Sequence, residues 1–215
     1  LSEAPNESKE TVLIIDVGTN AELILGNKYE LYACSSPTGP AFEGAQISSG
    51  QRAAPGAIEK VKIDPITKDP IFKVIGSDYW SDEIEFKNFV KNQPITGICG
   101  SGIIEAIAEM RINGILDKSG LIGSSIETGS KRSITDGRTY SYLLYEDKNN
   151  RENKIKITNA DVRAIQLAKA ALFAGSRLLM DEMKIKKVDK IVLAGAFGAH
   201  TVSYTHLTLP TKRIV

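Results

Sequence analysis

The chain has 215 residues, enough for one substantial hydrophobic core or two small domains. Its 27 basic and 26 acidic side chains leave a formal net charge of +1, so charge gives no indication of nucleic acid or an anionic membrane as a partner. No apolar run approaches the roughly 20 residues of a membrane helix and no secretion signal stands at the start, which predicts a cytoplasmic protein without a membrane partner.

Residues 1–10, LSEAPNESKE, are polar and aperiodic, which predicts a loose lead-in. Because the first residue is Leu1 and not methionine, we expect the chain to be a piece of a longer protein. Two strands joined at DVGTN are predicted over residues 11–25, and KYELYACSS adds a third. The first part of the chain is therefore expected to form a sheet meander.

The interruption DVGTN has two interpretations. A turn through Gly18, which lacks a side chain, lets the N–H groups of Gly18, Thr19 and Asn20 point at one place, and this suits phosphate oxygens. Asp16 would lie beside them and, because a carboxylate repels phosphate, would act through magnesium-bound water or by orienting an attacking water. A plain β-hairpin explains the same residues, since Asn and Gly are common in turns.

Residues 37–56 are nearly all small or turn-forming, which predicts an active-site loop containing a short helix. KVKIDPITKDPIFKVIG predicts a hairpin, and SDYWSDEIEFKNFVKN a charged surface excursion. ITGICGSGIIEAIAEMRINGIL then changes from strand to glycine-rich turn to helix, with Ile104, Ala108 and Ile112 on one face and Gly114 ending the helix.

The second half predicts a hairpin at Asp136-Gly137, a long helix and a last strand, KIVLAGAFG. Thr158 is a good N-cap for the helix, with Asp161 three residues later as a variant of the capping box. One stripe of the helix is apolar and predicts its core face: Ile165, Ala168, Leu172, Leu179 and Met183.

The two cysteines, Cys34 and Cys99, match no disulfide, redox or cluster spacing and are interpreted as reduced core thiols. Near the C-terminus, VSYTHLTLPT can be encoded by DNA that resembles the transposase adapter of short-read sequencing libraries. Residues 201–215 are therefore predicted to be foreign, although a real edge strand is the alternative, and His200 at the junction is left uninterpreted.

Several stretches resemble known families. IIDVGTNAE resembles the second phosphate loop, and VLAGAFG the adenosine loop, of the superfamily that contains actin, sugar kinases and the 70-kilodalton chaperones. GPAFEGAQISSGQRAAPGAIEKV, ITGICGSGIIEAIAEM and ITNADVRAIQLAKAAL resemble the nucleotide-binding domain of the ATP-dependent reductive activators of corrinoid proteins. The likeness runs from about residue 12 to 198, apart from residues 64–92.

This resemblance implies an α/β fold, an actin-like and ribonuclease H-like ATPase lobe with a mixed β-sheet flanked by helices. Residues 11–200 would be the second lobe of the domain, with the first phosphate loop upstream and the closing helices downstream. ATP and Mg²⁺ are the implied cofactors. The implied activity is ATP-coupled reduction of Co(II) to Co(I) in a corrinoid protein of a methyltransferase system, and the lobe alone is predicted to be inactive.

The electron in this family comes from an iron–sulfur cluster in a ferredoxin-like domain. Two isolated cysteines cannot supply the four ligands of such a cluster, so the cluster is expected in a part of the parent protein outside this chain.

The resemblance also assigns site residues. Asp16 is the catalytic and magnesium-water acid, and the binding residues are Gly18, Thr19, Asn20, Gly100, Gly195 and Gly198. For Gly100 in CGSG, tight helix–strand packing is an equal alternative. Glu22 and Glu43 are the other acids near these motifs, Glu22 also being explained as a strand residue facing water, and Arg52 would pair with phosphate or with an acid.

Two other functions remain open. The first is a small-molecule kinase of the same superfamily, which substrate-dependent phosphoryl transfer would support. The second is a lobe without turnover that docks a corrinoid protein, which partner binding without ATP hydrolysis would support.

Overall fold

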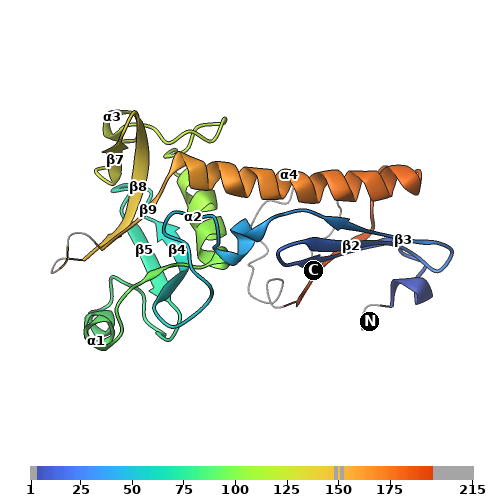
Figure 1. Cartoon of the computed structure of the whole chain (residues 1–215), viewed down its shortest axis with the longest axis horizontal. Coiled ribbons are helices and arrows are strands. Elements are labelled where there is room, and N and C mark those ends of the chain that lie inside the picture. The colour runs from blue at the N-terminus through green and yellow to red at the C-terminus, as the bar shows by residue number, and fades with distance from the viewer. Residues whose placement is uncertain (1–3, 148–149, 151–152, 196–215) are drawn as a thin grey trace. The chain divides into compact units, whose positions relative to one another are not determined.

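The computed structural model describes residues 4–147, 150 and 153–195 (Figure 1). Gly198, His200 and the segment 201–215 lie outside the described residues. The chain divides into two compact units. Unit 1 combines residues up to 40 with those from 167 onward, and unit 2 comprises residues 41–166.

Unit 1 is built on a four-stranded mixed sheet in the order β10-β1-β2-β3. Its strands are β1 (Val12–Val17), β2 (Ala21–Gly26), β3 (Leu31–Ser36) and β10 (Lys190–Ala194). β1, β2 and β3 form the predicted antiparallel meander, and β10 adds in parallel beside β1. The mixed sheet with its flanking helix agrees with the predicted α/β fold class.

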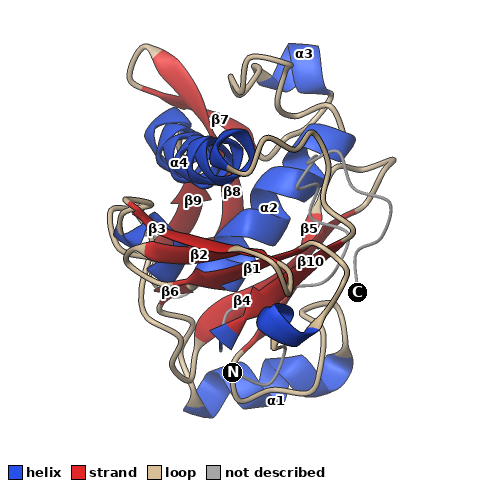
Figure 2. Cartoon of the chain, turned by 90° about the vertical axis from the view of Figure 1, so that its right-hand side faces the viewer, coloured by secondary structure: helices blue, strands red, loops and turns tan. Residues whose placement is uncertain are grey.

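The C-terminal two thirds of the long helix α4 (Asn159–Glu182) cover one face of this sheet (Figure 2). Ser36 on β3 donates its hydroxyl hydrogen to the Ala171 carbonyl of α4 at 2.7 Å. Gly175 lies against Leu23 of β2, so helix and sheet approach closely. All five residues of the predicted core stripe of α4 are buried, which confirms that prediction.

Unit 2 contains β4 (Ala57–Ile63), which pairs antiparallel with β5 (Pro70–Val74) and parallel with β6 (Gly97–Ile98). The β4–β5 pair is the predicted hairpin. The charged segment that follows holds α1 (Ile84–Asn92), a helix that sequence analysis did not predict. Most of α1 is exposed, as expected for a surface excursion, and Phe86 anchors it through an edge-to-face contact with Phe72.

Helix α2 (Gly100–Ile112) packs on β4, and Gly114 follows its end with a φ of 73°. The sequence pattern placed Ile104, Ala108 and Ile112 together on the apolar face of α2, and this prediction was wrong. Ile112 is exposed, whereas the buried stripe consists of Ile103, Ala106 and Met110. The helix is rotated by about one residue because Gly100 and Gly102 hold its first turn tightly against neighbouring backbone.

The remaining elements are short. They are η1 (Pro5–Glu7), η2 (Pro40–Glu43), α3 (Ser125–Thr128), β7 (Ser133–Asp136), β8 (Thr139–Glu146) and β9 (Lys154–Ile157). η2 is the short helix predicted for residues 37–56, and β7 and β8 are the hairpin predicted at Asp136-Gly137. None of the helices in the described ranges has the length and hydropathy that a bilayer span requires.

Candidate functional site

Asp16 and Gly195 meet at one end of the unit 1 sheet. Because β1 and β10 are parallel and pair in the register Asp16↔Ala194, their carboxyl ends lie side by side. A Cβ on Gly195 would lie 2.3 Å from Oδ1 of Asp16, so the Asp16 carboxylate occupies the space that any other residue at 195 would fill. The φ of 77° at Gly195 turns the chain away directly after the strand.

The turn Gly18-Thr19-Asn20 joins β1 to β2 beside Asp16. The Gly18 N–H donates to the Asn20 carbonyl at 2.9 Å, which closes the turn. Gly18 is half-buried, and Thr19 and Asn20 are exposed. The Gly18 N–H is thus engaged inside the turn, and the binding of phosphate by the three residues stays a prediction.

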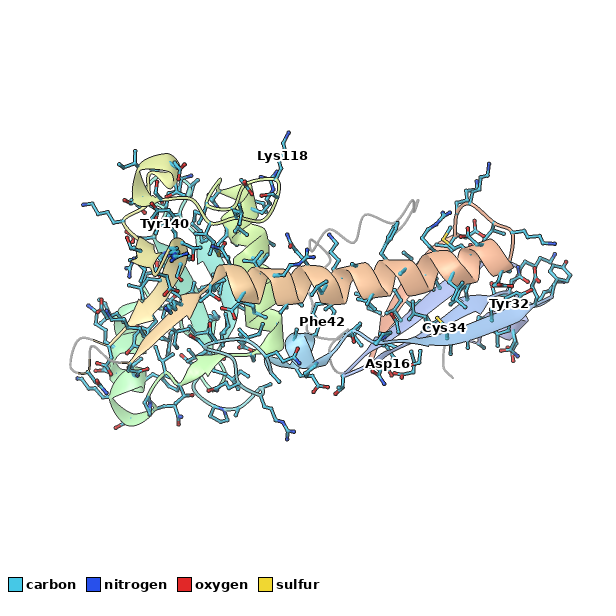
Figure 3. The ribbon with its side chains drawn as sticks, turned by 45° about the horizontal axis from the view of Figure 1, so that its top comes forward. Asp16, Tyr32, Cys34, Phe42, Lys118 and Tyr140 are labelled. Carbon is cyan, nitrogen blue, oxygen red and sulfur yellow. The ribbon has the colours of Figure 1, made fainter. Side chains whose placement is uncertain are left out.

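Strand alternation places Asp16 on the face of the sheet opposite α4. Cys34 on β3 contacts Gly175 of α4 through its sulfur at 3.8 Å, so Cys34 lies on the face that α4 covers. Side chains alternate along a strand, and the register of β1, β2 and β3 puts Asp16 on the other face. Figure 3 shows Cys34 beside α4 and Asp16 at the end of the sheet. Asp16 is exposed.

Glu22 shares this face with Asp16. The two residues are direct partners in the β1–β2 register, and the Ser35 hydroxyl donates to the Glu22 carboxylate at 3.4 Å. Like charges directly opposite on a sheet destabilise each other unless a cation or solvent separates them. Glu22 is exposed, which agrees with the interpretation of a strand residue facing water and also brings a second carboxylate to the site.

The carboxylates of Asp16 and Glu22 are candidate metal ligands at this end of the sheet. Among the residues that the structure describes, no three His, Cys, Asp or Glu side chains gather closely enough to hold a metal. Mg²⁺ commonly binds through one or two carboxylates, its own waters and substrate phosphates. The two exposed carboxylates of Asp16 and Glu22 are compatible with that mode.

Gly100 belongs to unit 2, and the structure gives it a packing role. A Cβ at this position would lie 1.6 Å from the Phe42 carbonyl oxygen, and a Cβ at Gly102 would lie 2.3 Å from that of Ile58. Close packing thus accounts for both glycines of CGSG. A contact from Gly100 to nucleotide stays a prediction, as does the role of Gly198.

The other chemically interesting residues are one cysteine of unit 1 and three residues of unit 2. Cys34 is half-buried against α4 in unit 1, where burial raises the pKa of its thiol, and Cys99 is buried in unit 2. Glu43 and Arg52 are both exposed in unit 2.

Sequence analysis missed Thr38, which contacts the turn from the loop after β3. Its hydroxyl lies 3.2 Å from the carbonyl oxygens of both Gly18 and Thr19. The stretch PTGP marks a loop, but no local pattern connects it with a turn nearly twenty residues earlier.

Asp161 also has a larger role than its predicted capping function. It exchanges hydrogen bonds with Thr158 as the capping box requires, and it additionally accepts from the N–H and the hydroxyl of Ser48 at 2.7 and 2.6 Å. The carboxylate therefore fixes residues 41–56 around Ser48, the glycine-rich loop, to the start of α4.

Comparisons with known proteins identify the group to which this chain is similar. The model of the C-terminal domain of RACo, the ASKHA domain, matches residues 10–208. The matched range includes the first residues of the segment 201–215, whose assignment as foreign stays a prediction.

Two curated relatives and one solved structure agree with the family model. The corrinoid activation enzyme RamQ of Eubacterium limosum is 35% identical over 198 residues, and a [Co(II) methylated amine-specific corrinoid protein] reductase of Methanosarcina barkeri is 34% identical over 203 residues. A structure of a reductive activator for corrinoid, iron-sulfur protein superposes with a TM-score of 0.74 at 34% identity and covers 91% of this chain.

The alignments cover most of this chain and a minor part of each relative. They span 88% and 89% of this chain but 30% and 33% of the two curated relatives, and 29% of the protein of known structure. The chain thus corresponds to about a third of the length of the proteins that it matches.

Proposed function

Because the chain belongs to the family of the C-terminal ASKHA domain of RACo, we propose that it is the ATP-binding and ATP-hydrolysing part of a reductive activator of corrinoid proteins. The whole protein would restore Co(I) from Co(II) in a corrinoid protein of a methyltransferase system. That step consumes one electron, which an iron–sulfur cluster outside this chain would supply.

The observation that carries the proposal is the meeting of Asp16, the turn after β1 and Gly195 at one end of a sheet. Ligands in open α/β sheets bind in the crevice outside the carboxyl ends of the strands, where loops bring backbone N–H groups and polar side chains together. The carboxyl ends of β1 and β10 lie at the same end of the sheet. The absence of a Cβ at Gly195 leaves room for the Asp16 carboxylate there.

Each residue has a distinct role in this proposal. Asp16 would bind the waters of a nucleotide-bound Mg²⁺ and orient the water that attacks the γ-phosphate. Thr19 and Asn20 would donate backbone hydrogen bonds to phosphate oxygens, and Gly18 would shape their turn. Gly195 would border the adenosine side. Magnesium, when bound, would neutralise part of the phosphate charge.

ATP can drive an unfavourable electron transfer only by changing the populations of protein states. A nucleotide that binds two conformations equally well shifts nothing, so the activator must bind ATP and ADP differently in its two states. The proposed part of this chain in that cycle is to bind and hydrolyse the nucleotide, and the corrinoid protein is the proposed partner.

The first test is nucleotide binding by the chain itself, measured by isothermal titration calorimetry with MgATP, with ATP in excess EDTA and with adenosine. The wild-type chain is expected to bind MgATP more tightly than metal-free ATP. Asp16→Asn should weaken MgATP binding by about tenfold, the effect of losing one charge-assisted interaction, and leave adenosine binding unchanged.

Two further variants sharpen this test. Gly195→Val should reduce MgATP affinity in the same way because its side chain would displace the Asp16 carboxylate. Asp181→Asn is the matched control, since it neutralises an exposed acid at the far end of α4, where its carboxylate pairs with Arg177. If Asp16→Asn and Asp181→Asn behave alike, the assigned role of Asp16 is wrong.

The same measurements separate the alternatives. A chain that binds a corrinoid protein but no nucleotide would be a docking lobe, and ATP turnover that requires a small acceptor would indicate a kinase. Long-read sequencing of the source DNA across both ends would show whether the reading frame extends beyond this chain. The complete protein should then produce the Co(I) absorbance of its corrinoid partner only when ATP is present.

A further inference from the structure

Thr38 is a buried residue whose side chain contacts two successive peptide groups. Its exposed fraction is 6%, and its hydroxyl lies 3.2 Å from the carbonyl oxygens of Gly18 and Thr19. A hydroxyl carries one hydrogen, so the two carbonyls share it in a three-centre arrangement.

This contact determines where the N–H groups of the turn point. In a trans peptide the carbonyl of one residue and the N–H of the next lie in one plane and point in opposite directions. The described residues contain no cis peptide bond. Since the Gly18 and Thr19 carbonyls both face the Thr38 hydroxyl, the N–H groups of Thr19 and Asn20 face the opposite side. Two successive N–H groups with one orientation form an anion-binding concavity.

Thr38 is itself held in place from α4. Its N–H donates to the Ser36 carbonyl at 2.9 Å, and the Ser36 hydroxyl donates to the Ala171 carbonyl of α4 at 2.7 Å. Pro37 on one side and Pro40 after Gly39 restrict the backbone of the short connection. A chain of hydrogen bonds therefore runs from the helix through Ser36 and Thr38 to the turn, entirely within unit 1.

We propose that Thr38 is a positioning residue, which orients the N–H groups of Thr19 and Asn20 toward the phosphates of the nucleotide. This inference rests on the proposed function, because it assigns a role at the same site. The inference extends the proposed function, because the residue that orients the phosphate-binding N–H groups would not itself touch the nucleotide.

The test compares two substitutions that differ in one hydroxyl. Thr38→Val keeps the β-branched shape and removes the hydroxyl, whereas Thr38→Ser keeps the hydroxyl and removes a methyl group. Thr38→Val should weaken MgATP binding by about tenfold, while Thr38→Ser should stay within about twofold of the wild-type chain. Thr135→Val, which removes an exposed hydroxyl on β7 in unit 2, is the matched control and should change nothing.

Two additional readouts distinguish positioning from loss of structure. Adenosine lacks phosphate, so Thr38→Val should leave adenosine affinity unchanged, whereas partial unfolding would weaken both ligands. In ¹⁵N–¹H spectra without nucleotide, the Thr19 and Asn20 amide signals should move in Thr38→Val and return toward their wild-type positions in Thr38→Ser.

The outcomes separate the two proposals. Wild-type binding of MgATP together with unchanged binding by Thr38→Val would overturn the role of Thr38 and leave the proposed function standing. Equal losses of MgATP and adenosine affinity in Thr38→Val would also overturn it, in favour of a structural role. A wild-type chain that binds no MgATP would overturn the proposed function and this inference with it.

Discussion

At the scale of single residues, Glu105 shows how a helix side chain can complete a sheet. Its carboxylate on α2 accepts the Val61 N–H of β4 at 3.0 Å, and Glu109 accepts the Ile63 N–H in the same way at 2.9 Å. These contacts satisfy the backbone N–H groups of Val61 and Ile63. Partial burial raises the pKa of Glu105 above its ordinary value of 4.5.

This raised pKa gives a pH dependence of known sign. The folded chain holds the Glu105 proton more strongly than the unfolded chain does. The contribution of Glu105 to the free energy of unfolding is therefore favourable below about pH 4.5 and is lost as the pH rises through the folded-state pKa. Glu105→Gln keeps an acceptor oxygen and cannot ionise. Its melting temperature relative to the wild type should therefore increase from about pH 4 to about pH 7, measured by circular dichroism.

Glu105→Ala provides the comparison for that experiment. It removes the acceptor and leaves the Val61 N–H without its partner, so the free energy of unfolding should fall by about 1–2 kcal/mol near pH 4. The loss relative to the wild type should be smaller near pH 7, because Glu105→Ala also removes the ionisable group. A difference between Glu105→Gln and the wild type that does not change with pH would show that ionisation of Glu105 does not matter for stability.

At the scale of elements, Asp161 joins α4 to the glycine-rich loop. The carboxylate is 1% exposed and accepts four hydrogen bonds, two from Thr158 and two from Ser48. The loop is further constrained by close backbone contacts, because a Cβ on Gly50 would lie 1.9 Å from the Gly44 carbonyl oxygen. The long helix and this loop are thus expected to lose structure together.

We expect Asp161→Ala to lower the free energy of unfolding by roughly 3 kcal/mol, because it removes a helix cap and also the two hydrogen bonds that Ser48 donates to the buried carboxylate. Urea denaturation measures this change. Glu127→Ala is the matched control, since Glu127 forms the exposed capping box of α3 with Ser124 and should cost less than about 1 kcal/mol. Similar losses in both variants would contradict the special role of Asp161.

At the scale of the whole molecule, one side of α4 exposes a row of apolar residues. Leu167, Phe173 and Leu178 are 55%, 49% and 56% exposed, and the exposed residues Ala170 and Ala174 lie between them. Large exposed apolar patches favour association, and a net charge of +1 provides little repulsion between copies.

The isolated chain is therefore expected to associate as its concentration rises, which size-exclusion chromatography with light scattering would measure. Leu167→Gln combined with Leu178→Gln should reduce this association severalfold. Ile66→Gln combined with Ile126→Gln is the control, because these two residues are even more exposed but are far apart in the sequence and not on one helix face. An equal effect of both pairs would exclude the α4 row as the cause.

The sequence alone determined the elements that depend on local chemistry. Alternation and turn residues placed the β1–β2–β3 meander and the hairpins, and the apolar stripe with its Thr158 cap placed α4, because strand period, helix period and capping act within a few residues. The resemblance of the motifs also identified the family, since DVGTN and the long glycine-rich block retain their order along the chain.

Only the tertiary structure decided how these elements meet. It brought Gly195 against Asp16 across 179 positions of sequence and directed Thr38 at the turn carbonyls. It also rotated α2 so that Ile103 rather than Ile104 is buried. The physical reason is that each of these features depends on close approach between backbone segments far apart in the chain, and no local pattern of residues specifies which segments approach one another.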